Sequence, residues 1–177
     1  LNLLGPGADQ LTITGSNVHQ LFSFTAPGHL GLSRLTLREF RGVDGPALEA
    51  YQTEVHLTEL QVLNNGASRE GGAMLIGDAD AVIESSTFAG NTATNNYGGI
   101  AYLGNNSRLL VRNSTFSGNS GPSSSAIANI ARGTGSSVVE LESTTLADNT
   151  GSAALTSVAN SSGAAVSRAQ NTLFGGA

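Results

Sequence analysis

The chain has 177 residues, of which 39% are hydrophobic and only 12% are charged, and its formal net charge is −5. A nucleic-acid partner is not expected, because phosphate binding needs a basic patch and the eight basic residues, all arginines, are scattered among carboxylates. The lack of cysteine excludes disulfides, thiolate metal sites and thiol nucleophiles.

Short apolar runs alternate with segments rich in Ser, Thr, Asn and Gly, and 23 residues are glycine. This composition is typical of turn-rich β structure, and no run is long enough to insert into a membrane. The chain starts at Leu1 without a methionine or a charged leader. We therefore expect residues 1–177 to form a single domain, a processed or excised segment of a larger exported protein.

Residues 46–63 are the first segment in chain order that allows two interpretations. Leu48, Tyr51, Val55 and Leu63 approximate a helical stripe, and Pro46 lies near its start. Residues 55–57 alternate like a strand instead, as do residues 81–83, 109–111 and 139–141. We favour strands, because residues 45–65 align block by block with the later repeats.

An apolar residue followed three positions later by asparagine marks each repeat. The pairs are Val62 with Asn65, Phe88 with Asn91, Phe116 with Asn119 and Leu146 with Asn149, so the asparagines recur after 26, 28 and 30 residues. A second mark is a pair of small residues followed by an apolar segment. It recurs with a similar spacing at residues 45–48, 71–74, 98–101, 124–127 and 152–155. Two marks with one period indicate a repeat architecture.

Each repeat thus contains at least two short strands separated by turns. One repeat cannot bury its apolar face alone, but stacked repeats form a continuous core and pair each strand with its equivalent one coil away. The sequence therefore predicts an all-β fold, a solenoid of parallel sheets with about six coils. With about 4.8 Å between stacked strands, the rod would be on the order of 30 Å long.

The two repeat marks have structural explanations. Asparagine tolerates turn dihedrals, and its amide can bond the equivalent amide above and below, so we expect a buried ladder of Asn65, Asn91, Asn119 and Asn149. The glycine pairs indicate turns that need positive φ or close approach. Seven residues before the last three asparagines lie Glu84, Arg112 and Glu142. We expect these to stack on the outer face as a charge ladder that controls coil register.

The combination of Phe-x-x-Asn with Gly-Gly-(Ala/Ile) resembles the repeats of chlamydial polymorphic outer membrane proteins and of bacterial right-handed β-helix repeat proteins. Residues 113–119 (NSTFSGN) match most clearly, and residues 5–13, 35–37 and 171–174 resemble early and late coils. The resemblance implies a right-handed, pectate-lyase-like parallel superhelix. It also implies export and a bacterial extracellular or cell-surface location. The pattern departs at Ser124-Ser125, where glycines are replaced, and at residues 175–177, where the expected asparagine is missing.

No residue set in the sequence identifies a reaction, so no catalytic or cofactor-binding residue is expected. The close acidic pair Asp78 and Asp80 is a weak candidate for calcium, and a solvated turn is the favoured interpretation. We expect His56 to point outward from a strand and His29, after Pro27-Gly28, to be a turn residue. Of the three tyrosines, Tyr97 and Tyr102 flank a glycine pair, and partly buried packing is favoured over stacking on sugar rings.

These motifs describe coil geometry, which favours a non-catalytic surface module such as an adhesin, an autotransporter passenger or a structural element of a surface assembly. Such a module would bind a surface glycan or a protein receptor. The alternative is a carbohydrate-active enzyme or a sugar-binding domain. A third expectation is end-to-end homo-association, because a stack of coils without caps exposes strand edges at both ends.

Overall fold

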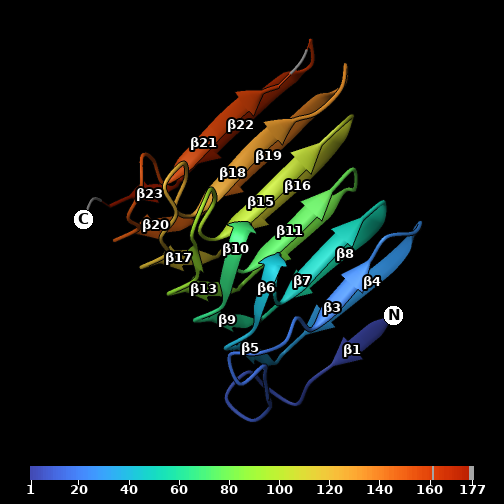
Figure 1. Cartoon of the computed structure of the whole chain (residues 1–177), viewed down its shortest axis with the longest axis vertical. Coiled ribbons are helices and arrows are strands. Elements are labelled where there is room, and N and C mark those ends of the chain that lie inside the picture. Colours follow the sequence, from blue (N-terminus) through green and yellow to red (C-terminus); the bar gives the residue numbers. More distant parts are fainter. Residues whose placement is uncertain (161, 176–177) are drawn as a thin grey trace.

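The computed structural model describes residues 1–160 and 162–175, and it contains 23 β-strands and no helix within them. Each strand lies beside its equivalent in the next coil, so the coils form a stack (Figure 1). The first and last coils lie at opposite ends of this stack. Every strand pair in the stack is parallel, as a solenoid requires. The predicted all-β solenoid of about six coils is confirmed.

Sheet A has seven strands and carries the alternating segments that the sequence indicated. Val55, Ala81, Leu109 and Val139 are in register across it and all point into the core. Its strands are β1 (Asn2–Leu4), β4 (Gly28–Ser33), β8 (Thr53–Thr58), β12 (Ala81–Glu84), β16 (Ser107–Arg112), β19 (Ser136–Glu142) and β22 (Ala164–Gln170).

Sheet B also has seven strands, each of two or three residues, and it holds the apolar half of the first repeat mark. Val62, Phe88, Phe116 and Leu146 stack in register and are fully buried. The strands are β2 (Thr12–Thr14), β5 (Thr36–Arg38), β9 (Gln61–Leu63), β13 (Thr87–Ala89), β17 (Thr115–Ser117), β20 (Thr145–Ala147) and β23 (Leu173–Phe174).

Sheets C and D complete the coil. Sheet C has six strands: β3 (Phe22–Phe24), β7 (Leu48–Tyr51), β11 (Met74–Gly77), β15 (Ile100–Gly104), β18 (Ile127–Ala131) and β21 (Leu155–Ala159). Sheet D has three: β6 (Arg41–Asp44), β10 (Gly66–Glu70) and β14 (Thr92–Ala93). A coil in the middle of the rod therefore runs from sheet C through A, B and D back to C, for example from β7 to β11.

The structure resolves the ambiguity of residues 46–63, which form β7, β8 and β9. The helical alternative is wrong for this segment. Side chains of β8 alternate between buried and exposed, which is the period of a strand with one face in the core. A complete coil has three or four strands, one or two more than the minimum that the sequence indicated.

The alignment of the second repeat mark needs one correction. Aligning Gly98-Gly99 with Gly71-Gly72 would pair Met74 with Ala101, whereas the structure pairs Met74 with Ile100. A slip of one residue would turn Ile100 out of the core, so burial of the larger side chain decides the register. The departure expected at residues 175–177 lies largely outside the described residues, since 176 and 177 are not among them.

Glycine is required where neighbouring coils come closest. A Cβ on Gly99 would lie 2.1 Å from the carbonyl oxygen of Ala126 in the next coil, and one on Gly72 would lie 2.0 Å from that of Gly98. In the structural register Ser124, Ser125 and Ala126 are the equivalents of Tyr97, Gly98 and Gly99. The hydroxyls of Ser124 and Ser125 donate to the carbonyl oxygens of Ile127 and Ala153. The small-residue mark thus reports close backbone approach between coils.

Candidate functional site

The asparagines of the first repeat mark form one continuous column. The Nδ2 atoms of Asn65, Asn91 and Asn119 donate to the Oδ1 atom of the next asparagine at 2.9–3.0 Å, and so do their backbone N–H groups at 3.0 Å. The second Nδ2 hydrogen of Asn91 and Asn119 goes to the carbonyl oxygens of Val62 and Phe88. All of these groups serve the coil turns, so the column is scaffold.

Glu84, Arg112 and Glu142 lie in register at the ends of β12, β16 and β19. The Nε atom of Arg112 lies 3.3 Å from Oε1 of Glu84, and both side chains are more than a third exposed. An exposed ion pair of this kind contributes about 0–1 kcal/mol. Arg112 is also in register with Glu142, but no ion pair joins these two among the described residues, so only one step of the expected charge ladder forms.

Asp78 and Asp80 lie in the turn between β11 and β12. Their carboxylates do not form a common binding site with a third ligating side chain from the described residues. Asp78 takes a φ of 49°, the left-handed turn conformation that aspartate tolerates. The Oδ1 atom of Asp80 accepts the backbone N–H of Arg108 at 2.9 Å. Within the part of the chain that the structure describes, neither aspartate belongs to a cluster of metal-ligating side chains.

His29 is not a turn residue, and this expectation is wrong. It lies in β4, in register with Glu54 of β8, because the chain becomes extended at Gly28. His56 points outward from β8 as expected, on the same face as Glu54. The result is a cluster of His29, Glu54 and His56 on the outer face of sheet A, hereafter the histidine cluster.

Sequence reasoning missed Glu54 in this cluster. The spacing of Glu54 and His56 by two residues on a strand was the available signal, because such residues share one face. The position of His29 beside Glu54 depends on the length of the coil between β4 and β8. His29 and Glu54 are 25 residues apart, shorter than the spacings of 26 to 30 between the asparagines.

The outer face of sheet C differs from the outer faces of the other sheets because it is apolar. Side chains of β15 and β18 alternate between the central core and a second buried cluster on the opposite face. This second cluster contains Leu75, Ala101, Leu103, Ala128 and Ile130, each no more than 2% exposed. Tyr51 and Tyr97 pack against it and stay half-buried. We call this surface the tyrosine face.

The position of Tyr51 depends on a glycine in the neighbouring coil. Gly77 is in register with Tyr51, and a Cβ there would lie 2.3 Å from Cε1 of the Tyr51 ring. The Tyr51 ring therefore lies against Gly77, where only a glycine leaves room for it. Burial raises the pKa of both Tyr51 and Tyr97, so both phenols remain neutral hydrogen-bonding groups at pH 7. The third tyrosine, Tyr102, points into the core and donates to the Ala79 carbonyl oxygen at 2.8 Å.

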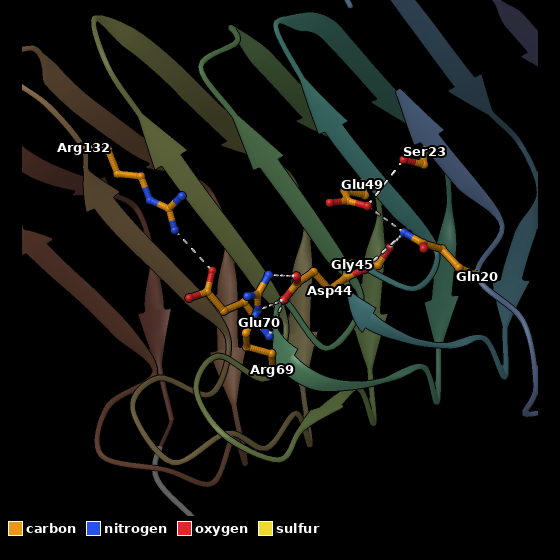
Figure 2. A network of polar contacts seen from close by, with 8 residues as sticks. All are labelled: Gln20, Ser23, Asp44, Gly45, Glu49, Arg69, Glu70 and Arg132. Carbon is orange, nitrogen blue, oxygen red and sulfur yellow. Dashed lines mark hydrogen bonds and ion pairs between the residues drawn. The ribbon is translucent and has the colours of Figure 1, made fainter. Parts of the chain in front are cut away.

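Paired charges border the tyrosine face (Figure 2). The guanidinium of Arg69 binds both carboxylate oxygens of Asp44, with its Nε atom 3.0 Å from Oδ1. Arg132 extends across the face to Glu70, from which it is 62 residues away in the chain, with 3.5 Å between the charged atoms. The side chains of Arg69 and Arg132 are 60% and 48% exposed, so both guanidinium groups remain accessible to a ligand.

At the other end of this border, Glu49 receives two hydrogen bonds from the preceding coil. Nε2 of Gln20 donates to Glu49 at 3.1 Å, and the hydroxyl of Ser23 donates at 3.4 Å (Figure 2). The polar groups are thus held in place by neighbouring coils before any ligand arrives.

The coil path, the parallel sheets and the buried asparagine column define the architecture, and comparison with known proteins agrees with it. The family model described as right handed beta helix region matches residues 31–176. The chain belongs to the right-handed β-helix family. No curated protein and no solved structure matches it. The family includes both enzymes and surface proteins, so membership establishes the fold and leaves function to the site.

This right-handed β-helix presents two chemically different outer surfaces. The tyrosine face offers aromatic rings and paired charges, which suit stacking and hydrogen bonding to a ligand. The histidine cluster on sheet A offers imidazole and carboxylate groups, which suit a cation. The described residues include no helix long and apolar enough to cross a membrane.

Proposed function

We propose that the chain is a non-catalytic module of an exported bacterial surface protein, an adhesin or autotransporter passenger, and that its tyrosine face binds a surface glycan. The observation that carries this proposal is the position of Tyr51 and Tyr97 on a buried apolar floor, beside the accessible guanidinium groups of Arg69 and Arg132. Aromatic rings stack on the apolar faces of sugars, and fixed charged groups select hydroxyl or carboxylate substituents.

Rigidity supports a binding role for this surface. The floor residues belong to strands that are hydrogen-bonded on both sides. Tyr51 ends one strand of this sheet, Tyr97 forms an isolated bridge to Ser124, and Arg132 directly follows β18, so each group is close to regular structure. A ligand would therefore pay little conformational entropy in the protein when it binds. A flat face along a rod also suits a polymer with repeated units.

The test is binding of the purified chain to a panel of neutral and acidic polysaccharides, measured by isothermal titration calorimetry. We expect a ligand whose affinity falls at least about tenfold in Tyr97→Ala and in Arg132→Ala. Arg168→Ala is the matched control, because Arg168 is an exposed arginine of sheet A that pairs with Glu140. Equal losses in the control and in Arg132→Ala would contradict the tyrosine face as the binding surface.

A carbohydrate-active enzyme is the second candidate, and one observation favours it. Glu54, Asp80 and Arg108 line a groove on the outer face of sheet A, so carboxylates and a guanidinium group are close together there. Turnover of the same polysaccharide panel distinguishes the two functions. If the chain is a non-catalytic module, no polysaccharide of the panel is depolymerised. Depolymerisation that disappears in the Asp78→Ala, Asp80→Ala double variant would establish an enzyme.

We also propose that the rod associates end to end. Strands β1 and β22 each have only one neighbour in sheet A, so each presents a free edge. Apolar side chains are exposed near both edges, with Leu4 at 71% and Phe174 at 51%. Sedimentation at increasing protein concentration would show growing species, and a strictly monomeric chain would contradict the proposal.

A further inference from the structure

The histidine cluster brings three metal-ligating side chains from two neighbouring coils to one place. Glu54 and His56 are two residues apart on β8, so they share the outer face, and His29 of β4 is the register neighbour of Glu54. Within the described ranges this is the one group of three or more such side chains that could surround a cation. It plays no part in the glycan-binding proposal, which concerns a different sheet.

The distances in the cluster are those of a coordination site. Oε2 of Glu54 lies 3.4 Å from Nδ1 of His29, and Oε1 lies 3.1 Å from Nε2 of His56. One ligand atom from each residue can be chosen so that all three lie within 4.8 Å of one another. Zinc bonds to nitrogen and oxygen are about 2.0–2.2 Å long, so tetrahedral ligand atoms are about 3.4 Å apart. The three ligand atoms would have to approach one another by at most about 1.4 Å to reach that geometry.

The site is open to an incoming ion. The three side chains are between 43% and 54% exposed, so no part of the fold has to open. Gly31 lies beside them, in register with His56, and the Asn2 side chain occupies the space next to this glycine. Both imidazoles border a groove that Asn2 also lines. A Cβ at Gly31 would lie 3.8 Å from Nε2 of His29.

The ligand types indicate which cation fits. Calcium and magnesium prefer six or more oxygen ligands, whereas two imidazoles with one carboxylate suit zinc and its neighbours in the first transition row. The Glu54 carboxylate between the rings compensates part of the positive charge of the ion. Three protein ligands leave a fourth position for water or another ligand.

We propose that His29, Glu54 and His56 bind one divalent transition-metal ion, with Zn²⁺ as the representative ion. Bound there, the ion cross-links β4 to β8 and so joins two successive coils near the N-terminal end of the rod. Because the site exists only when these strands are paired, metal binding stabilises the folded coils.

The first measurement is titration of the full chain with ZnCl₂ by isothermal titration calorimetry. We expect one ion per chain. His29→Ala, His56→Ala and Glu54→Gln should each weaken binding by more than about tenfold, because even partners outside the coordination shell cost at least that much when removed. His19→Ala is the matched control, since His19 is an exposed histidine outside the cluster, and its affinity should equal that of the native chain.

The second measurement is thermal unfolding with and without Zn²⁺. The native chain and His19→Ala should gain several degrees in Tm, and the His29→Ala, His56→Ala double variant should gain none. The double variant changes only exposed side chains, so it should fold, and its Tm without metal reports this directly. Absence of Zn²⁺ binding in the native chain, equal affinity in the double variant, or equal affinity for Ca²⁺ would each overturn the proposal.

Discussion

The amide Nδ2 of Asn91 donates to the Oδ1 atom of Asn119, 28 residues later, at 3.0 Å, and both residues are completely buried. The same oxygen also accepts the backbone N–H of Asn91 at 3.0 Å. One side chain thus satisfies two donors in the neighbouring coil and donates back to the Phe88 carbonyl oxygen. Buried polar groups are costly when they lose such partners.

Asn119→Ala should therefore lower the free energy of unfolding by about 3 kcal/mol, because it leaves the donors of Asn91 and the acceptor of Phe88 without partners. Urea unfolding followed by circular dichroism measures the change. Asn95→Ala is the control, since Asn95 is exposed, and it should stay within about 0.5 kcal/mol of the native chain. Equal urea midpoints for the two variants would show that the column contributes nothing.

The rings of Phe88 and Phe116 are nearly parallel, with centroids 4.7 Å apart and an interplanar angle of 3°. A double-mutant cycle with Phe88→Leu and Phe116→Leu should give a coupling energy of about 0.5–1.5 kcal/mol. A second cycle with Phe116→Leu and Phe24→Leu should give none, because Phe24 contacts Phe22 instead. Coupling of similar size in both cycles would mean that the stack itself is not the cause.

Glu140 on β19 pairs with both Arg108 and Arg168. Partial burial raises the pKa of this carboxyl, but the hydrogen bonds from Arg108 and Arg168 outweigh burial and lower the pKa below its ordinary value of 4.5. A lowered pKa in the folded state adds stability above the unfolded value, and this stability disappears as the pH falls through the folded pKa.

Glu140→Gln should consequently lower the free energy of unfolding by about 0.5–1 kcal/mol at pH 7, and the difference should decrease as the pH falls below 4.5 and vanish below the lowered pKa of the folded state. Urea unfolding at a series of pH values measures it. Asp9→Asn, at an exposed position, is the control and should follow the native curve. A difference that persists unchanged at acid pH would rule out the charge interaction as its origin.

Gly99→Ala should lower the free energy of unfolding by at least about 3 kcal/mol, because the added Cβ would meet the Ala126 carbonyl oxygen at 2.1 Å and that coil cannot move away. Gly28→Ala is a matched glycine control on β4. Its Cβ would meet only the Ala26 carbonyl oxygen, at 3.9 Å, so the change should be neutral or slightly stabilising. Thermal unfolding compares both with the native chain.

Much of the fold could be predicted because each coil repeats the same local requirements. The apolar residue three positions before each asparagine, such as Phe88 before Asn91, indicates one strand end and one turn in every coil. Local patterns failed where register depends on the neighbouring coil. Ile100 was placed one residue out of line because either of two adjacent glycine alignments fits the sequence, and only burial of Ile100 in the core selects one of them.

The candidate site was less predictable than the fold, because its residues meet through stacking. Glu54 lies beside His29 because the step from β4 to β8 is 25 residues long, and the length of each coil does not follow from a pattern of a few residues. The apolar outer face of sheet C was missed for a related reason. Ala101 and Leu103 look like parts of a continuous buried strand until the alternation of neighbouring side chains assigns them to the face opposite the core.

The sequence by itself indicated that this chain is a parallel β solenoid, since repeats that cannot each bury an apolar face alone stack and form a continuous core. The tertiary structure alone decided which side chains share a surface. It brought His29, Glu54 and His56 together, and it placed Tyr51 against Gly77 and close to Arg69 and Arg132. The physical reason is that contacts between coils depend on the exact length of each coil, whereas the fold depends only on the repetition.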